Sequence, residues 1–322
     1  MNKLVIISGP TSSGKTSTSI SLATELKKLG ISSAIVNFDS LLFYKELTIG
    51  TAKPTNEELE QVEHHLVNIS SAKEPLNASD YIKLAEEKII ELFKQNKIVF
   101  LVGGSGFYLR ALIKGMYESR TPNEQLQKEL DQLYKEQGIA PFLSYLEEHD
   151  PQSLVNLHEN DHYRLIRAVE HHKMTGEPIS KEKERFDQKN PYDFSENGHP
   201  DWDIFHLYLD LPKDEHWEII QKRTQKMFDD GLVDEVQSLL DQGFSGLEKP
   251  LQSIGYKETV GYLRGEYSTI NNCQERLNIS TRQLAKSQRT FFKKVSPKVQ
   301  YHPLQDKQKI HQDLLKFITQ KN

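Results

Sequence analysis

The fold of this chain is decided by the stretch Gly9-Pro10-Thr11-Ser12-Ser13-Gly14-Lys15-Thr16. An apolar run, 4–7, precedes it, and a segment with a helical pattern, 17–29, follows it. Two glycines that flank four residues and are followed by Lys and Thr form a phosphate-binding loop when they join a strand to a helix. Backbone N–H groups at the N-terminus of a helix attract an anion, Lys15 adds a positive charge, and the Thr16 hydroxyl can ligate Mg²⁺. We therefore expect all eight residues to bind a diphosphate or a triphosphate.

Strand and helix patterns alternate up to about residue 115, which predicts a parallel sheet covered on both faces. The strands are expected at 4–8, 34–38 and 98–102, and the helices at 15–29, 56–64 and 79–95, the last with Ser79 as N-cap. From 118 to 200 helical patterns dominate, and 181–200 is expected to be a loop; a strand at 203–211 and several helices follow. We predict an α/β fold with a P-loop NTPase/kinase-like parallel sheet core, 1–117 and 201–322, interrupted by a helical insertion domain, 118–200.

The composition suits a soluble protein of the cytoplasm. Of the 322 residues, 36% are hydrophobic and 27% are charged, and the one cysteine, Cys273, can form neither an internal disulfide nor a cysteine-based metal site. No apolar run approaches the length of about 20 residues that spans a bilayer. The net charge of −5 argues only weakly against nucleic acid, because seven basic residues and no acidic ones lie between Arg276 and Lys298.

Two other strand ends carry candidate site residues. Asp39 follows the second strand, at the edge where α/β proteins bind ligands, and can hold Mg²⁺ through water, act as a general base, or cap a turn. Ser105 follows the third strand, within Gly103-Gly104-Ser105-Gly106. Glycines there allow the backbone to approach a ligand closely, or form a tight turn.

Basic and histidine residues give further candidates. One helical stripe without an intervening acid contains Arg282, Lys286, Arg289 and Lys293, which favours binding to a phosphate backbone. Arg164 and Arg167 lie one turn apart on another expected helix, where phosphate binding and a solvated face remain alternatives. The adjacent pairs 64–65 and 171–172 are expected to be structural or surface histidines.

An ordered set of motifs across nearly the whole chain resembles the tRNA dimethylallyltransferases, also called tRNA isopentenyltransferases. The segments 49–54 and 281–286 are the most distinctive. Besides the phosphate-binding loop, the set comprises Asp39-Ser40, Tyr44-Lys45, Ile49-Gly50-Thr51-Ala52-Lys53-Pro54, His64-His65-Leu66, Leu101-Val102-Gly103-Gly104-Ser105-Gly106, Tyr163-Arg164-Leu165-Ile166-Arg167-Ala168, Ile254-Gly255-Tyr256-Lys257-Glu258 and Thr281-Arg282-Gln283-Leu284-Ala285-Lys286.

The resemblance implies transfer of a five-carbon group from dimethylallyl diphosphate to the exocyclic amine of the adenine 3′ of the anticodon, flipped out of its loop. It makes Asp39 the general base, and it makes Lys15, Mg²⁺ on Thr16, and Arg223 the groups that stabilise departing pyrophosphate. Ser105 takes the place of a family threonine near the base. Contacts with the tRNA anticodon stem-loop are expected from Ser40, Leu41, Leu42, Ser105, Tyr163, Arg164, Leu165, Ile166, Arg167, Gln252, Gly255, Tyr256, Lys257, Arg282, Gln283, Lys286 and Arg289.

The sequence departs from the family in a few positions. After Lys286 the family usually has Arg, then Gln, and then Trp three residues further on, whereas this chain has Ser287, Gln288 and Phe291. Around Asp39, Phe38 replaces a small residue and Leu42 a common Gln. One cysteine cannot form the zinc finger of eukaryotic members, so we expect a bacterial-type enzyme. We also expect a monomer, because one tRNA and one channel need no partner.

The main alternative is a P-loop small-molecule or nucleoside kinase that uses ATP. That alternative leaves the basic helix 282–293 without a role. A guanine-nucleotide switch is disfavoured, because the only Asn-Lys pair after a plausible switch region, 96–97, is followed by Ile98 and Val99 rather than by the required Asp.

Overall fold

The computed structural model describes residues 2–115, 123–187 and 190–320, and the chain divides into two compact units. The larger unit consists of Met1–Ile113 and Tyr192–Asn322, and the smaller unit is Lys114–Pro191. The expected boundary at 117/118 lies outside the described residues, and the expected end at 200 lies within the larger unit.

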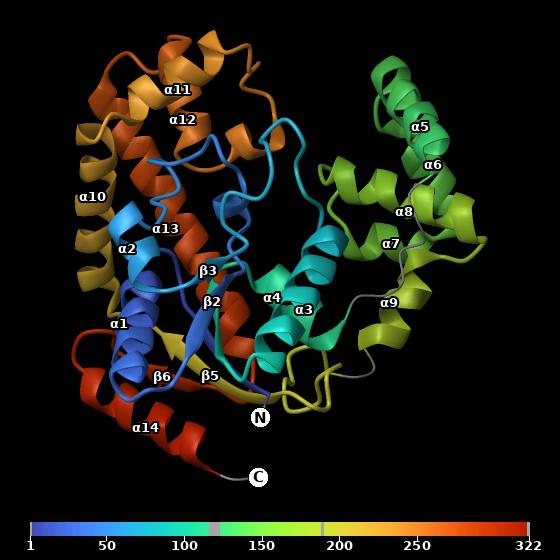
Figure 1. Ribbon diagram of the computed structural model, residues 1–322. Coiled ribbons are helices and arrows are strands. Elements are labelled where there is room, and N and C mark those ends of the chain that lie inside the picture. The colour runs from blue at the N-terminus through green and yellow to red at the C-terminus, as the bar shows by residue number, and fades with distance from the viewer. Residues whose placement is uncertain (1, 116–122, 188–189, 321–322) are drawn as a thin grey trace. The chain divides into compact units, whose positions relative to one another are not determined.

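A six-stranded parallel sheet in the order β3-β2-β4-β1-β5-β6 forms the centre of the larger unit (Figure 1). The strands are β1 (Lys3–Ser8), β2 (Ser33–Asn37), β3 (His64–His65), β4 (Ile98–Gly103), β5 (Asp203–Leu209) and β6 (Val299–Tyr301). All residues of β1 and β4 are buried, as in parallel sheets with both faces covered. The predicted α/β fold with a parallel sheet is confirmed.

Helices cover both faces of the sheet. On one face, α1 (Lys15–Lys28) and α14 (Lys307–Thr319) pack on β1, β2, β4 and β5 through a core that includes Leu26 and Leu314. On the other face, α3 (Ala78–Lys94), α4 (Gly106–Lys114) and the end of α13 (Ile270–Lys294) contribute Ile89, Leu112 and Phe292. The strands β1, β2 and β4 are therefore almost completely covered, whereas the edge strands β3 and β6 are partly exposed.

A third core lies at the start of α13. It is formed by α10 (Lys213–Asp229), α11 (Leu232–Asp241) and α12 (Tyr256–Leu263), which pack around Tyr44, Leu47 and Tyr256. The short helix η2 (Lys249–Gln252) precedes α12. Since α13 has 25 residues and is about 37 Å long, it reaches from this core to the core between the sheet and α3 and α4 (Figure 1).

The structure corrects several local expectations. The helix expected at 56–64 is α2 (Asn56–Gln61), capped by Thr55, and it ends before β3. His64 and His65 pair instead with Ile35 and Val36 of β2, which a two-residue edge strand cannot reveal by periodicity. The N-cap of α3 is Asn77, which exchanges side-chain hydrogen bonds with Asp80, and not Ser79.

The smaller unit is helical throughout its described regular structure. Its helices are α5 (Glu124–Gln137), α6 (Ala140–His149), α7 (Pro151–Asn156), α8 (His162–Thr175) and α9 (Ile179–Asp187), around a core that contains Phe142, Leu146 and Leu165. The segment expected as a loop, 181–200, thus begins inside a helix. A tertiary contact fixes its start, because the buried Asp150 carboxylate accepts hydrogen bonds from the backbone and hydroxyl of Ser180.

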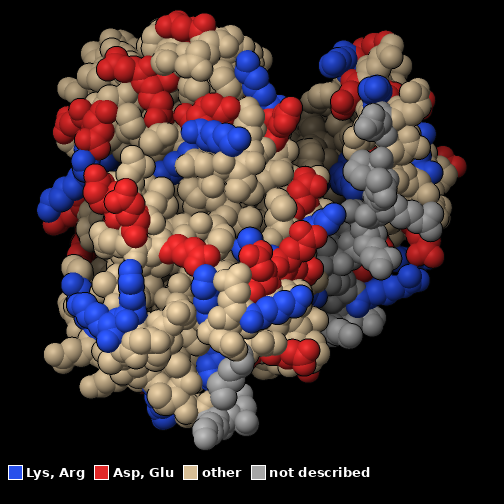
Figure 2. Space-filling view, in the orientation of Figure 1, with Lys and Arg blue, Asp and Glu red and all other residues tan. Residues whose placement is uncertain are grey.

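Charges of both signs are interspersed on the face of the larger unit seen in Figure 2. The net charge of −5 is therefore not gathered into one field on that face. Within residues 2–115, 123–187 and 190–320, no helix is both long and apolar enough to cross a membrane.

Candidate functional site

The carboxyl ends of three neighbouring strands bring the candidate residues together. Ser8 of β1 is in register with Gly103 of β4, and Asn37 of β2 is in register with Val102. Adjacent strands lie about 4.8 Å apart. The loop 9–16, Asp39 and the turn 103–106 consequently leave the sheet at the same edge, where ligands bind in open α/β sheets.

The phosphate-binding loop is shaped to receive an anion. Gly14, with φ of 81°, precedes α1, and no side chain caps this helix, so its first N–H groups are directed at the loop. Among the described residues the buried Ser13 hydroxyl has no hydrogen-bond partner. A methyl group on Gly9 would lie 2.4 Å from the carbonyl oxygen of Leu209, so only glycine fits there.

The Lys15 side chain bonds the backbone of this loop. Its Nζ donates to the carbonyl oxygens of Gly9 and Pro10, at 3.1 and 2.8 Å. Burial lowers the pKa of the Lys15 ammonium to about 8, an effect that nearby Asp39 opposes and nearby Arg223 reinforces. A bound phosphate would supply the negative charge that this site lacks.

Asp39 is held firmly at the end of β2. Both amide atoms of the buried Asn37 side chain bond the backbone of Asp39: Nδ2 donates to its carbonyl at 2.9 Å, and Oδ1 accepts from its N–H at 2.8 Å. The carboxylate also caps η1 (Ser40–Phe43), accepting from the N–H of Leu41 at 3.2 Å. Asp39 is thus a positioned carboxylate with a second oxygen available for chemistry.

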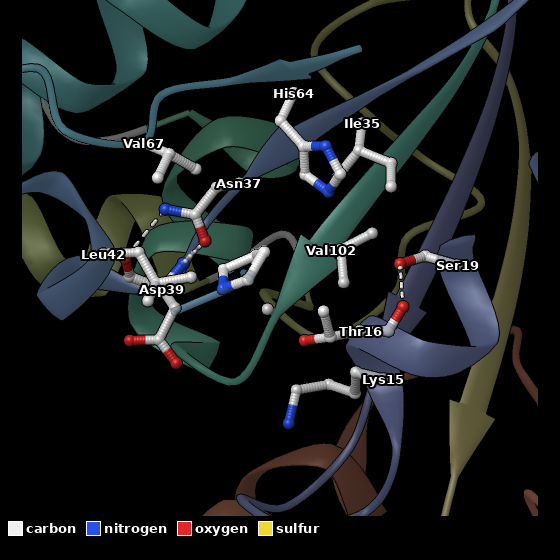
Figure 3. Close-up of a pocket in the computed structure, with 12 residues that line it drawn as sticks. Lys15, Thr16, Ser19, Ile35, Asn37, Asp39, Leu42, His64, Val67 and Val102 are labelled. Atoms are coloured by element: carbon white, nitrogen blue, oxygen red, sulfur yellow. Dashed lines mark hydrogen bonds between the residues drawn. The ribbon is translucent and has the colours of Figure 1, made fainter. Parts of the chain in front are cut away.

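One pocket joins the donor and acceptor candidates. Lys15, Thr16 and Asp39 line it, together with the apolar side chains of Ile35, Leu42, Pro54, Val67 and Val102. In Figure 3 the Thr16 hydroxyl and the His64 ring face the space beside Val102. The pocket can therefore hold a charged group next to a small apolar one.

His64 is a pocket residue that the sequence did not identify. Its Nδ1–H donates to the carbonyl of Val62 at 2.7 Å, which leaves Nε2 as the bare acceptor. Nε2 has no partner among the described residues, and burial lowers the pKa of the ring. The sequence pattern treats it as a structural or surface histidine, because nothing local shows that β3 delivers it to this pocket.

Arg223 of α10 connects two loops beside the pocket. Its guanidinium donates to the Ser12 hydroxyl at 3.3 Å and to the carbonyl of Thr51 at 3.4 Å. Burial lowers the pKa of Arg223, and the charge of Asp39 opposes that shift. The structure therefore joins the phosphate-binding loop to the segment 49–54 through a partly buried cation.

The glycines of 103–106 make room for protein side chains. A methyl group on Gly103 would lie 2.7 Å from Phe38, one on Gly104 would lie 2.6 Å from Nε2 of Gln288, and one on Gly106 would lie 2.3 Å from the ring of Phe291. Protein atoms, rather than a ligand, therefore exclude side chains from these three positions. Close approach to a ligand is one of the two roles expected for these glycines.

The basic stripe of α13 divides into exposed and enclosed members. Arg282, Gln283, Lys286 and Lys293 are exposed, and the Arg282 guanidinium stacks 3.1 Å from the ring centre of Trp217 on α10. Arg289 turns inward, donating to Asp210 at 2.8 Å, to the Leu211 carbonyl at 3.2 Å and to Nδ1 of His216 at 2.6 Å.

The other residues expected to contact RNA differ in exposure. Tyr163 is 76% exposed on α8, whereas Leu165 and Tyr256 are fully buried and present no surface to RNA. Arg164 and Arg167 each pair with an acid of their own helix segment, Asp161 and Glu170. Of the rest, Gln252 and Lys257 are exposed, Gly255 is buried, and Ser40, Leu41, Leu42, Ser105 and Ile166 are partly buried.

Comparison with known proteins assigns a family to this arrangement. A model of the IPP transferase family matches residues 42–295. The chain is 37% identical over 292 residues to tRNA dimethylallyltransferase 2 of Geotalea daltonii, an alignment that covers 91% of this chain and 85% of the relative. It is 36% identical to the tRNA dimethylallyltransferase of Geobacter sulfurreducens, with 91% and 89% covered.

Solved structures give the same assignment. The full-length tRNA isopentenylpyrophosphate transferase of Bacillus halodurans superposes with a TM-score of 0.68 at 29% identity, covering 99% of this chain and 97% of that one. A eukaryotic dimethylallyltransferase described as acting on tRNA superposes with a TM-score of 0.75 at 22% identity, covering 97% and 77%, which shows the shared fold.

Proposed function

The chain belongs to the IPP transferase family, and from this premise we propose that it is a bacterial-type tRNA dimethylallyltransferase. It transfers the dimethylallyl group of dimethylallyl diphosphate to the exocyclic amine of the adenine 3′ of the tRNA anticodon and releases pyrophosphate. The observation that carries the proposal is that Lys15, Thr16 and Asp39 line one pocket with apolar walls. A kinase acting on ATP is not favoured, because the named relatives are tRNA dimethylallyltransferases.

The pocket residues divide the reaction between them. Asp39 accepts a proton from the adenine amine while the nitrogen attacks the first carbon of the prenyl group and the carbon–oxygen bond to the diphosphate breaks. An aromatic amine is a weak nucleophile, so this proton transfer lowers the barrier. Lys15, the loop N–H groups and Arg223 stabilise the charge that develops on pyrophosphate. We assign Ser105, partly buried just after β4, to the acceptor side, as the resemblance implies.

The donor set at the pocket fits Mg²⁺ held largely by the substrate. Mg²⁺ usually keeps several waters and binds one or two protein oxygens together with substrate phosphates. Thr16 supplies a hydroxyl and Asp39 a carboxylate to the same pocket, and the described residues contain no cluster of three or more His, Cys, Asp or Glu that could cage a metal ion. The Thr16 hydroxyl would hold Mg²⁺, and the bound ion would neutralise part of the diphosphate charge.

RNA binding is assigned to exposed groups on each unit separately. On the larger unit, Arg282 and Lys286 of α13 present cations for phosphates. On the smaller unit, the exposed Tyr163 ring can stack on a base, and Arg164 beside it can bind the anticodon stem-loop. We further propose that the enzyme is a monomer, because one tRNA and one pocket need no partner, and that it works in the cytoplasm.

The test compares wild type with Asp39→Asn, because asparagine retains an oxygen for the N–H of Leu41 while it removes the base. Purified protein receives Mg²⁺, radiolabelled dimethylallyl diphosphate and an anticodon stem-loop with adenine at the target position. Wild type should transfer label, and Asp39→Asn should be about 10²- to 10⁴-fold slower, as when a general base is lost.

RNA affinity and pyrophosphate affinity should both persist in Asp39→Asn, which shows that the variant is folded. A parallel reaction with ATP in place of the prenyl donor serves as the control. Failure of wild type to label RNA, together with consumption of ATP on a small acceptor, would overturn the proposal in favour of a kinase.

A further inference from the structure

We propose that Gln288 is a positioning residue that sets the distance between the diphosphate and the acceptor base; this inference rests on the function proposed above. Gln288 lies on α13, where it is partly buried between two loops that leave neighbouring strands. It belongs neither to the phosphate-binding loop nor to the exposed basic face of the helix. Its side chain joins the two parts of the site that have to meet in the reaction.

The carboxamide of Gln288 bridges the two loops directly. Its Oε1 accepts from the N–H of Thr11 in the phosphate-binding loop at 2.7 Å, and its Nε2 donates to the carbonyl of Gly104 at 3.0 Å. The next residue after Gly104 is Ser105, assigned to the acceptor side. Because the carboxamide is planar and rigid, the two bonds fix the separation of the loops, as a tether of fixed length would.

Thr11 is held on its other side as well. Nε2 of His216 donates to the carbonyl of Thr11 at 2.7 Å, and Nδ1 of His216 accepts from Arg289 at 2.6 Å. Arg289 is in turn anchored by Asp210, at the end of β5. Two consecutive residues of α13 therefore hold the backbone of Thr11: Gln288 bonds its N–H directly, and Arg289 holds its carbonyl through His216. Gln288 also bonds the second loop.

Close packing makes the bridge sensitive to small changes. A methyl group on Gly104 would lie only 2.6 Å from Nε2 of Gln288. It would also lie 3.5 Å from the carbonyl oxygen of Gly9. The two loops thus meet with no spare volume. A shift of about 1 Å between reacting groups can cost about 100-fold in rate, so a residue that fixes this contact acts on the chemical step.

The experiment measures single-turnover prenyl transfer with both substrates saturating, in wild type and in Gln288→Met, which conserves length and removes both hydrogen bonds. We expect the rate to fall about 10- to 100-fold, while the dissociation constants for pyrophosphate and for the RNA change less than about threefold. Gln274→Met, a matched change about four turns earlier on the same helix, should react as wild type does.

A second variant guards against misfolding. Gln288→Asn keeps the amide but shortens its reach by one carbon, so that it can satisfy only one of the two loops. It should also slow single turnover while both dissociation constants stay near those of wild type. This split between rate and binding separates positioning from a general loss of structure.

Two results would overturn the inference while the function stands: an unchanged single-turnover rate in both variants, or a fall in rate accompanied by an equal weakening of pyrophosphate or RNA binding, as a general loss of structure would cause. Failure of the proposed function has a different signature. In that case wild type itself transfers no label to RNA, and the positioning role falls with it.

Discussion

At Gly104 the turn 103–106 packs against the phosphate-binding loop and Gln288 without room for a side chain. Its missing side chain is replaced by the amide of Gln288, so Gly104→Ala must displace that amide. We expect Gly104→Ala to slow single turnover about 10- to 100-fold, as Gln288→Met does.

The double variant Gly104→Ala with Gln288→Met provides the internal control. Residues that act through one contact are not additive, so the double variant should be scarcely slower than either single variant. Rate losses that multiply would show that the two residues act independently.

The sequence revealed the residues of the site whose signal is local. Gly14, Lys15 and Thr16 follow from spacing around a strand–helix junction, and Asp39 follows from its place after a strand. His64 and Gln288 could not be predicted, because a two-residue strand and a hydrogen bond spanning 277 residues leave no periodic trace.

At the scale of the element, α13 presents one face to solvent and another to the site. We expect Lys286→Ala to weaken binding of the stem-loop and to reduce the slope of log affinity against log salt concentration by about 0.7–0.9, as loss of one phosphate contact does. Pyrophosphate affinity should not change, because Lys286 is exposed and Gln288 carries the contact with the loop.

The measurement is a salt titration of RNA binding by fluorescence anisotropy. Lys307→Ala, an exposed lysine at the start of α14, is the matched control and should leave the slope unaltered. Equal slopes for Lys286→Ala and wild type would remove this face of α13 from the RNA interface.

The stripe of α13 also shows where helical spacing stops being informative. Arg282, Lys286 and Arg289 share one side of the helix by spacing. Arg289 nevertheless pairs with Asp210, because the end of α13 passes over the end of β5. Which part of a stripe is covered depends on tertiary packing that spacing does not encode.

At the scale of the whole molecule, the buried His206 ties stability to pH. Burial, aided by the charge of Lys298, lowers the pKa of His206 to about 3, and its Nε2 bonds the Ser8 hydroxyl at 2.7 Å. The unfolded chain takes up a proton near pH 6.5, where the folded protein does not. The contribution of neutral His206 to the free energy of unfolding is therefore complete above pH 6.5 and is lost progressively as the pH falls toward 3.

Urea unfolding at pH 7, 6 and 5 tests this dependence. One proton taken up only by the unfolded chain changes the free energy of unfolding by about 1.4 kcal/mol per pH unit. The variant His206→Gln can still bond Ser8. Its free energy of unfolding should fall less per pH unit on acidification than that of wild type, by up to about 1.4 kcal/mol per unit. Identical slopes in the variant and wild type would show that His206 does not remain neutral in the fold.

The overall α/β architecture follows from sequence because its strands are apolar runs between helical patterns. The run 4–7 and the run 98–102 are buried along their full length, as expected for a parallel sheet. The edge strands β3 and β6 cannot be predicted from the sequence, because two or three residues show no periodicity. Helix α9 cannot be predicted either, because its start bonds the buried Asp150, a tertiary contact.

The central place of β1 has a consequence for biosynthesis. Ile6 pairs with Leu101 on one side and with His206 on the other, so one neighbour is encoded 200 residues later. At translation rates of about 5–20 residues per second, β5 emerges roughly 10–40 s after β1. During that interval the edge of β1 that will pair with β5 is bare, whereas the contiguous smaller unit, Lys114–Pro191, is completed before β5 is made. The nascent chain is thus most open to chaperones, and to mispairing, at the strand that carries its phosphate-binding loop.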